Sequence, residues 1–198
     1  MRKLIILTFI TLDGIMQAPG GPEEDTSGGF EYGGWVVPYF DEFSNEIMED
    51  QMNRPFDLLL GRKTYDLFAS YWPHHKDEGR SLNEAVKYVT SHEDIELSWE
   101  KSILLKGDIA EEVQKIKNMD GPDIQVHGSG ELIQTLFKNN LIDEMWLKIF
   151  PITLGTGKRL FGEGTIPKAF RLKESKISPK GVIFANYEFA GEVQTGTF

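Results

Sequence analysis

The fold is decided by the stretch Gln125-Val-His-Gly-Ser-Gly-Glu-Leu-Ile-Gln-Thr-Leu136. It continues a short apolar strand at 124–126 and then places Leu132, Ile133 and Leu136 on one face of a helix. The glycines between strand and helix lack a Cβ, so a phosphate can approach the backbone and meet the free N–H groups and positive dipole end of the helix. Tight packing alone also explains a Gly-x-Gly turn, and at this point both interpretations stay open.

A second turn of the same type follows the predicted strand Phe56–Gly61. The next residues, Arg62, Lys63 and Thr64, begin a predicted helix. Two basic residues at a helix N-terminus oppose the helix dipole, so an anionic ligand explains them better than the helix does. The sequence therefore predicts two strand-to-helix turns that are suited to phosphate.

Length, composition and charge exclude several classes of protein. The 198 residues are 40% hydrophobic and 12% aromatic, which suits a single domain over residues 1–198 with one substantial core. No cysteine is present, so thiolate catalysis and cysteine metal sites are excluded, and the cytoplasm is the expected location. A formal net charge of −10 argues against nucleic-acid binding.

Two further segments bear on location and on metals. The N-terminal apolar run is interrupted by Thr8, Thr11 and Asp13 too soon for a signal peptide or a membrane span, so no membrane association is expected. The adjacent His74 and His75 lack the spacing of a zinc site, and we expect an exposed loop there and no metal.

The order of predicted elements gives the fold class. From Lys3–Ile10 to Phe137, strands alternate with helices, as in a largely parallel sheet. After Asp143 the pattern changes to three strands at 145–152, 170–178 and 182–189, of which the last two form a hairpin across Pro179-Lys-Gly181. We therefore expect an α/β fold with a mixed, mostly parallel sheet and an antiparallel C-terminal hairpin.

Three segments together resemble one known family. They are Val126-His-Gly-Ser-Gly-Glu-Leu-Ile133, Leu141-Ile-Asp-Glu-Met-Trp-Leu147 and Pro151-Ile-Thr-Leu-Gly-Thr-Gly-Lys-Arg-Leu-Phe161. They are similar to the family that unites dihydrofolate reductase with the reductase domain of the bifunctional riboflavin-biosynthesis deaminase-reductase, and most similar to its small stand-alone bacterial members. The resemblance covers nearly the whole chain and implies the three-layer dihydrofolate reductase-like fold.

The resemblance also implies NADPH as the cofactor. It assigns cofactor contacts to Asp13, Gly14, Gly61, Arg62, Lys63, Thr64, Ser91, His92, Gly128, Ser129, Gly130, Glu131 and Leu132. Ser91 and His92 would lie at the adenosine end, where a hydroxyl and a cation suit a 2′-phosphate. Ordinary turns explain Asp13-Gly14 and Ser91 without a ligand, and Glu131 would repel a phosphate unless it points outward.

On the substrate side, the resemblance implies a carboxylate, because dihydrofolate reductase uses one just after a Trp and a Pro to hold and protonate the pterin. Asp41, in a helix expected to open at Pro38, is the nearest match and the candidate catalytic residue. Its spacing from Trp35 is one residue longer than in the family, and an acid in a first helical turn also serves the dipole. The predicted substrate contacts are Trp35, Lys148, Phe150 and Lys158.

Two of these predictions leave alternatives open. Trp35 is either a wall of the substrate pocket or a core aromatic. The glycine-rich segment 17–34 is either a lid over the site or a surface insertion.

The leading function is an NADPH-dependent reductase that transfers hydride to a heterocyclic or ribitylated small molecule. It would resemble 5-amino-6-(5-phosphoribosylamino)uracil reductase of riboflavin biosynthesis. The alternatives are dihydrofolate reductase activity and a non-enzymatic, nucleotide-binding regulatory protein. The apolar segments Met145–Ile152 and Val182–Phe189 carry more bulk than one sheet end easily buries, and together with the dimers of related reductase domains they predict a homodimer.

Overall fold

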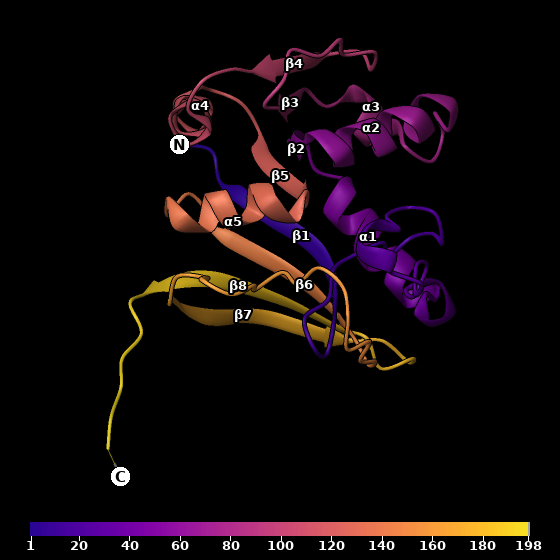
Figure 1. The fold of residues 1–198 in the computed structure, drawn as a ribbon, viewed down its shortest axis with the longest axis vertical. Helices are drawn as coiled ribbons and strands as arrows, with labels where there is room; N and C mark the ends of the chain where they lie inside the picture. The colour runs from indigo at the N-terminus through magenta and orange to yellow at the C-terminus, as the bar shows by residue number, and fades with distance from the viewer. Residues whose placement is uncertain (198) are drawn as a thin grey trace.

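The computed structural model describes residues 1–197 and places one eight-stranded sheet between two layers of helices (Figure 1). The strands are β1 (Leu4–Thr11), β2 (Phe56–Gly61), β3 (Lys87–Thr90), β4 (Ser102–Leu105), β5 (Asp123–Gly128), β6 (Glu144–Phe150), β7 (Ala169–Ile177) and β8 (Ile183–Gly191). Their order across the sheet is β4-β3-β2-β5-β1-β6-β8-β7. The first six strands pair in parallel, and β8 pairs antiparallel with both β6 and β7. The predicted mixed sheet with an antiparallel C-terminal hairpin is thus confirmed.

The helices divide between the two faces of the sheet. They are α1 (Glu42–Met52), α2 (Arg62–Tyr71), α3 (Arg80–Glu84), α4 (Ile109–Asn118) and α5 (Gly130–Lys138), with short 3-10 turns η1 (Ser27–Gly29), η2 (Val37–Tyr39) and η3 (Trp72–His74). In Figure 1, α4 and α5 lie on one side of the sheet and α1, α2 and α3 on the other. No helix of residues 1–197 is long and apolar enough to cross a membrane.

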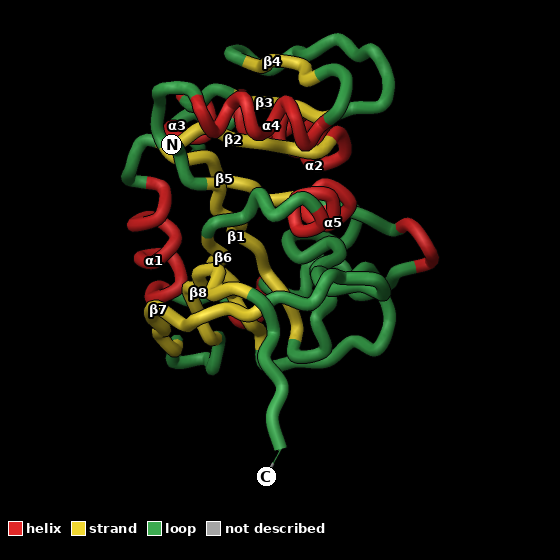
Figure 2. The backbone as a smooth tube through the Cα atoms, turned by 90° about the vertical axis from the view of Figure 1, so that its left-hand side faces the viewer, coloured by secondary structure: helices red, strands yellow, loops and turns green. Residues whose placement is uncertain are grey.

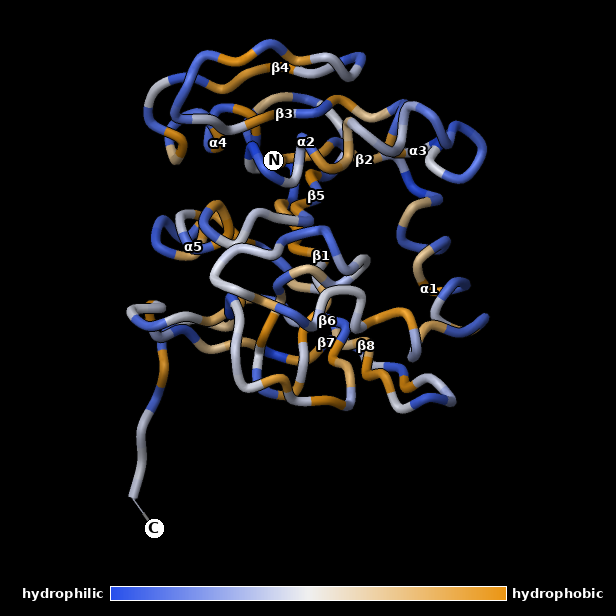
Figure 3. Tube along the Cα trace, turned by 45° about the vertical axis from the view of Figure 1, so that its right-hand side comes forward, coloured by the Kyte–Doolittle hydropathy of each residue, from blue (hydrophilic) through white to orange (hydrophobic). Residues whose placement is uncertain are grey.

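The core follows this division into layers. One buried cluster joins α4 and α5 to the sheet through residues such as Val113 and Ile133. On the opposite face, one cluster surrounds Phe150 and Phe184 beneath α1, and another surrounds Leu58 beneath α2 and α3. Figure 3 shows the hydrophobic residues concentrated along the strands. Burial of apolar area on both faces is the main source of stability in such a fold.

Two helices differ from the sequence-based expectation. The helix expected to open at Pro38 begins at Glu42, because Pro38 lies in η2 and Phe40 and Asp41 are extended between the two elements. The short helix α3 was not predicted, since its five residues are too few to show a helical period.

The expected surplus of apolar surface lies elsewhere than predicted. Strand β6 is buried between β1 and β8, so the interpretation of Met145–Ile152 as exposed bulk is wrong. Exposed apolar side chains occur instead on the edge strand β7, at Leu172 and Ile177, and on β8 at Phe189. After β8 the chain leaves the sheet, as Figure 2 shows.

Candidate active site

The parallel strands bring the predicted cofactor residues to one edge of the sheet. Asp13 and Gly14 follow β1, and residues 61–64 follow β2. Ser91 and His92 follow β3, and residues 128–132 join β5 to α5. Because the carboxyl ends of parallel strands meet at the same edge, these segments share one surface, where ligands of open α/β sheets commonly bind.

The two strand-to-helix turns are in direct contact. A Cβ on Gly61 would overlap the hydroxyl of Ser129 and lie 2.9 Å from the Ser129 backbone nitrogen. A Cβ on Gly128, whose φ is 156°, would lie 2.7 Å from Thr64 Oγ1. Glycine is therefore required at both positions for the turn after β2 to pack against the turn after β5.

Both helices that begin at these turns lack a side-chain cap. Gly61 is the N-cap of α2 and Ser129 is the N-cap of α5, and neither forms a side-chain capping bond. By contrast, Asp41 accepts from Ser44 N at the start of α1, and Asp108 accepts from Glu111 N at the start of α4. The uncapped first turns leave backbone N–H donors free, which makes the two adjacent helix ends suited to an anion.

The charged groups beside this pair of helix ends are mostly exposed. Arg62 Nε donates to Asp66 Oδ2 at 2.6 Å, and Arg62 Nη1 lies 4.0 Å from Glu93 Oε2. An exposed i,i+4 ion pair contributes little stability, so Arg62 can exchange Asp66 for an anionic ligand. Lys63 and Glu131 are exposed, so Glu131 points outward, as a phosphate site requires.

The neighbouring strand end adds two predicted contacts. Gly61 pairs with Thr90, which places Arg62 beside the Ser91-His92 turn. Ser91 Oγ accepts from Glu93 N, and His92 is exposed. Leu132 is buried in the core, so its backbone alone remains for a cofactor contact.

Asp13 fixes the loops at this edge. Its carboxylate accepts from Thr11 Oγ1 at 2.5 Å and from Gly155 N at 2.8 Å, and its carbonyl accepts from Arg159 Nη1 at 2.5 Å. The Thr11 hydrogen bond is the largest influence on the carboxyl and lowers its pKa below the ordinary value. These contacts join the end of β1 to the glycine-rich loop after β6, so the carboxylate orders the site.

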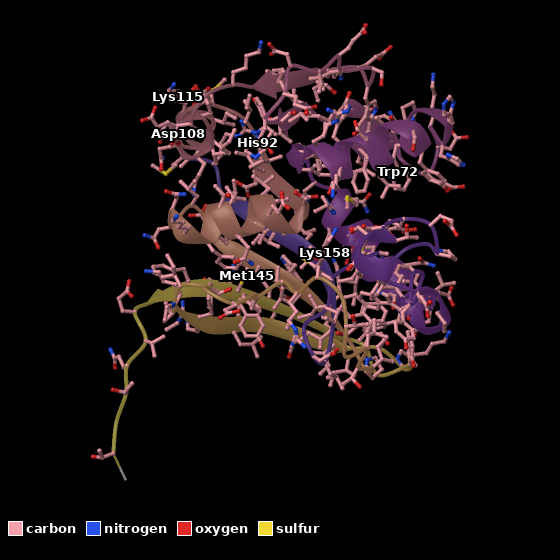
Figure 4. All side chains as sticks on the ribbon, viewed as in Figure 1. Trp72, His92, Asp108, Lys115, Met145 and Lys158 are labelled. Carbon is pink, nitrogen blue, oxygen red and sulfur yellow. The ribbon has the colours of Figure 1, made fainter. Side chains whose placement is uncertain are left out.

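Lys158 and the glycine-rich segment 17–34 hold each other. Lys158 Nζ donates to Asp25 Oδ2 at 2.5 Å and to Ser27 Oγ at 2.7 Å, and Lys158 N donates to Gln17 Oε1 at 2.9 Å. Figure 4 shows Lys158 among these loops near the middle of the molecule. The ammonium predicted to bind substrate is therefore engaged within the protein.

Two predicted substrate contacts, Trp35 and Phe150, are core residues. Trp35 is buried, its Nε1 donates to Gln17 O at 2.8 Å, and its ring meets Phe150 edge-on at 5.3 Å. Phe150 is buried as well and also contacts the rings of Phe9 and Tyr39. Of the two alternatives for Trp35, the structure supports the core aromatic.

Asp41 has a structural role at the start of α1. Its Oδ1 accepts from Ser44 N at 2.9 Å and from Ser44 Oγ at 2.6 Å, while Lys180 donates to the nearby carbonyls of Pro38 and Phe40. The Ser44 hydrogen bond is the main reason that the pKa of Asp41 lies below its ordinary value. A carboxylate with a lowered pKa is a poor proton donor at neutral pH, so this geometry favours helix capping.

Lys148 is buried on β6, only 1% exposed, beneath the face that carries α1. Its Nζ lies 5.3 Å from the centre of the Phe9 ring. Burial lowers the pKa of Lys148 to about 7. The same face carries His127, whose pKa burial and then Lys148 lower to about 3, and whose Nε2 is 3.2 Å from Gln125 Oε1. Lys148 thus stands beside polar residues within an otherwise apolar layer.

A separate apolar groove of about 300 Å³ lies at the other end of α5, lined by residues that include Phe137, Phe161 and Phe170. Phe137 belongs to the last turn of α5, whereas Ser129 precedes its first turn. The groove is therefore remote from the paired turns.

Comparison with known proteins now identifies the family. A family model described as the RibD C-terminal domain matches residues 2–184. The chain belongs to the RibD C-terminal domain family. The uncharacterized Bacillus subtilis (strain 168) protein YyaP is 29% identical over 200 residues, covering 96% of this chain and 96% of its own. The Bacillus subtilis (strain 168) protein YwjB is 25% identical over 178 residues, covering 88% of this chain and 91% of its own.

Solved structures share the fold of this RibD C-terminal domain. A riboflavin biosynthesis-like protein from Shewanella sp. PV-4 has a TM-score of 0.70 at 24% identity, covering 96% of this chain and 99% of its own. A pyrimidine reductase-like protein from Corynebacterium diphtheriae has a TM-score of 0.61 at 14% identity, with coverage of 96% and 93%. Dihydrofolate reductase from Enterococcus faecalis, in complex with NADP(H) and RAB-propyl, has a TM-score of 0.60 at 13% identity, with coverage of 97% for both chains. The resemblance drawn from the motifs is confirmed.

Sequence reasoning on this RibD C-terminal domain missed the polar residues on and beneath α1. Gln51, Gln125 and His127 were not assigned to the site, although His127 stands within the motif that decides the fold. The signal that was available is a set of polar residues on elements whose other side chains are apolar, and Lys148 within the apolar strand β6 is its clearest member.

Proposed function

We propose that this protein is an NADPH-dependent reductase acting on a heterocyclic or ribitylated small molecule. The observation that carries the proposal is the contact between two uncapped helix N-termini, those of α2 and α5, at the carboxyl edge of a parallel sheet. Membership of the RibD C-terminal domain family supports a reductase, and the NADP(H) complex of the Enterococcus faecalis relative in fold supports the choice of cofactor.

The residues at this edge fit a dinucleotide diphosphate. The free N–H groups of the first turns of α2 and α5 and the hydroxyl of Thr64 would bind phosphate oxygens. Arg62 would neutralise their charge, and Lys63, Ser91 and His92 would meet the 2′-phosphate that distinguishes NADPH from NADH. A chain of net charge −10 needs such a local cluster of cations and N–H donors to attract a polyanion.

When bound, the reduced nicotinamide would supply the hydride. The chain contributes position and electrostatics: the Asp13 contacts hold the loops after β1 and β6, and the buried rings of Trp35 and Phe150 support the face on which a substrate would lie. The names of two relatives in fold, a riboflavin biosynthesis-like protein and a pyrimidine reductase-like protein, support a pyrimidine such as 5-amino-6-(5-phosphoribosylamino)uracil as the substrate.

The test is an NADPH-oxidation screen of the purified full chain. The compounds are 5-amino-6-(5-phosphoribosylamino)uracil, dihydrofolate and free flavins. We expect NADPH oxidation that requires the pyrimidine and that is weakened at least about tenfold in kcat/KM for NADPH by Arg62→Ala. Turnover with dihydrofolate alone would replace the proposed substrate, and no oxidation with any compound would overturn the reductase assignment.

A further inference from the structure

Lys148 is a buried lysine without a counter-ion or hydrogen-bond partner. It is 1% exposed, and within residues 1–197 its ammonium forms no hydrogen bond or salt bridge. Two other buried lysines are fully engaged: Lys87 donates to the carbonyls of Asn83 and Glu100, and Lys117 pairs with Asp143. An unpaired buried cation costs free energy, so its presence indicates a functional requirement.

The polar residues around Lys148 form a row on one face of the sheet. Gln125 pairs with Ile5, which pairs with Glu144, and residues an even number of positions away on the same strand point to the same face. Lys148 therefore shares its face with Gln125, His127 and Glu144, and the Glu144 carboxylate is already engaged by Lys3 and Lys173. The backbone carbonyl of Gln51, on α1, accepts from Gln125 Nε2 at 3.2 Å, which brings α1 onto this row.

The row reaches the candidate cofactor edge. His127 directly precedes Gly128 of the turn between β5 and α5, and Lys148 stands two residues before the end of the parallel strand β6. The side chains of Phe9 and His127, although on central strands, are only half-buried, so this face of the sheet is partly accessible beside the Phe9 ring, whose centre is 5.3 Å from Lys148 Nζ. A ligand that enters this layer next to the paired turns would meet Lys148 Nζ.

We infer that Lys148 is the catalytic acid of the proposed reductase. The inference rests on the proposed function, which supplies the hydride from a reduced nicotinamide. The hydride adds to carbon of a C=N or C=O bond, so the substrate gains two electrons and the nicotinamide is oxidised. One N–H bond of the Lys148 ammonium breaks, its proton bonds to the substrate nitrogen or oxygen, and the neutral amine then takes a proton from water.

The electrostatic surroundings suit this role. Burial lowers the pKa of Lys148 to about 7, so the acid and the amine are both populated at neutral pH. Phe9 faces it from β1, Phe184 from β8 and the neutral His127 from β5, and no carboxylate contributes to its pKa. Asp41, the other candidate, has one carboxylate oxygen without a hydrogen-bond partner, Oδ2, but its pKa is shifted downward, away from the value that a proton donor needs.

The test compares Lys148→Met with Lys115→Met, a change of the same type on the exposed face of α4. In Figure 4, Asp108 and Lys115 lie on the α4 side of the sheet, far from Trp72, which lies on the side of α1, α2 and α3. Lys115 is therefore on the opposite side of the sheet from Lys148. We expect Lys148→Met to lower kcat by about a hundredfold or more with NADPH affinity by calorimetry unchanged, and Lys115→Met to leave both unchanged. In the unaltered enzyme kcat should fall as pH rises through about 7, since the protonated amine is required, and Lys148→Met should lack this step.

A second readout does not depend on turnover. In protein labelled at lysine Cε with ¹³C, the resonance that Lys148→Met removes should titrate near pH 7, and titration of that resonance near 10.5 would overturn the inference. Turnover that survives in Lys148→Met within about threefold, with an unchanged pH profile, would overturn it while leaving the reductase assignment intact. Absence of NADPH oxidation by the unaltered protein would instead overturn the proposed function, and this inference with it.

Discussion

Gly61 packs against Ser129 so closely that a Cβ on Gly61 would lie 2.9 Å from the Ser129 backbone nitrogen. The two residues are the N-caps of α2 and α5, which are 68 positions apart in sequence, 129 minus 61, and neighbouring strands bring them together. This contact makes one anion-binding surface from two helix ends, because neither helix uses a side-chain cap.

Replacing the glycine should separate the two turns. We expect Gly61→Ala to destabilise the fold by about 1–3 kcal/mol, the usual cost of overpacking, and to weaken NADPH binding more than tenfold. Gly162→Ala is the matched control, since a Cβ there meets no atom within 4 Å. Urea unfolding and calorimetry measure the two effects, and a Gly61→Ala protein with unaltered affinity for NADPH would show that the contact is not needed for the site.

The two candidate roles of Asp41 are separated by a pair of variants. Asparagine caps a helix about as well as aspartate, so Asp41→Asn should keep both the melting temperature and turnover, whereas Asp41→Ala should lower the melting temperature. A loss of turnover in Asp41→Asn with the fold retained would restore Asp41 as the proton donor. Steady-state kinetics with the substrate from the NADPH screen gives the answer.

The burial of Lys148 should be visible in the pH dependence of stability. The folded pKa, about 7, lies below the ordinary lysine value of 10.5, so between these values the unfolded chain binds more protons and stability rises with pH. Lys148→Met lacks this contribution. We expect it to be the more stable protein near pH 6, by on the order of 2 kcal/mol, because no ammonium has to be buried.

The stability advantage of Lys148→Met over the unaltered protein should shrink by about 2–3 kcal/mol between pH 7 and pH 9. The reason is that the free energy of unfolding of the unaltered protein rises by up to about 1.36 kcal/mol per pH unit in this range. Lys87, whose pKa burial lowers to about 8, is present in both proteins and cancels in the comparison. Urea midpoints across this pH range measure the difference. A gap that does not change with pH would mean that Lys148 keeps an ordinary pKa.

The predicted homodimer has a specific surface to use. β7 is an edge strand with an unpaired side and with exposed Leu172 and Ile177. Edge strands of this kind pair readily with a second chain. We expect light scattering at micromolar concentration to give a mass about twice 22.5 kDa, and Ile177→Lys to shift it toward a single chain. A mass near 22.5 kDa for the unaltered protein would contradict the dimer.

Local patterns predicted most of the elements of this fold. The strand Phe56–Gly61 and the helix start at Arg62 follow from an apolar run that ends in glycine, and the hairpin of β7 and β8 follows from the turn residues Pro179-Lys-Gly181. Such signals depend on residues a few positions apart. The helix expected to open at Pro38 shows the limit of such local signals: two start signals, Pro38 and Asp41, lie close together, and the helix begins after the cap at Asp41.

Contacts between distant strands could not be read in this way. Gly61 meets Ser129 only because β2 and β5 are neighbours, and Lys148 shares a face with His127 only because β1 separates their strands by one place. The sequence predicted Lys148 as a substrate contact, whereas its burial without a partner depends on the whole layer beneath α1. Local sequence patterns therefore predict the fold better than they predict the chemistry of this site.

The central claim is that the paired helix ends bind NADPH. Calorimetric titration of the full chain with NADPH and with NADH tests it most directly, with Lys63→Ala as the variant that removes one charge from the proposed 2′-phosphate contact. We expect saturable binding of NADPH, at least about tenfold weaker binding of NADH, and loss of most of that preference in Lys63→Ala. Equal affinities for the two dinucleotides, or no binding of either, would contradict it.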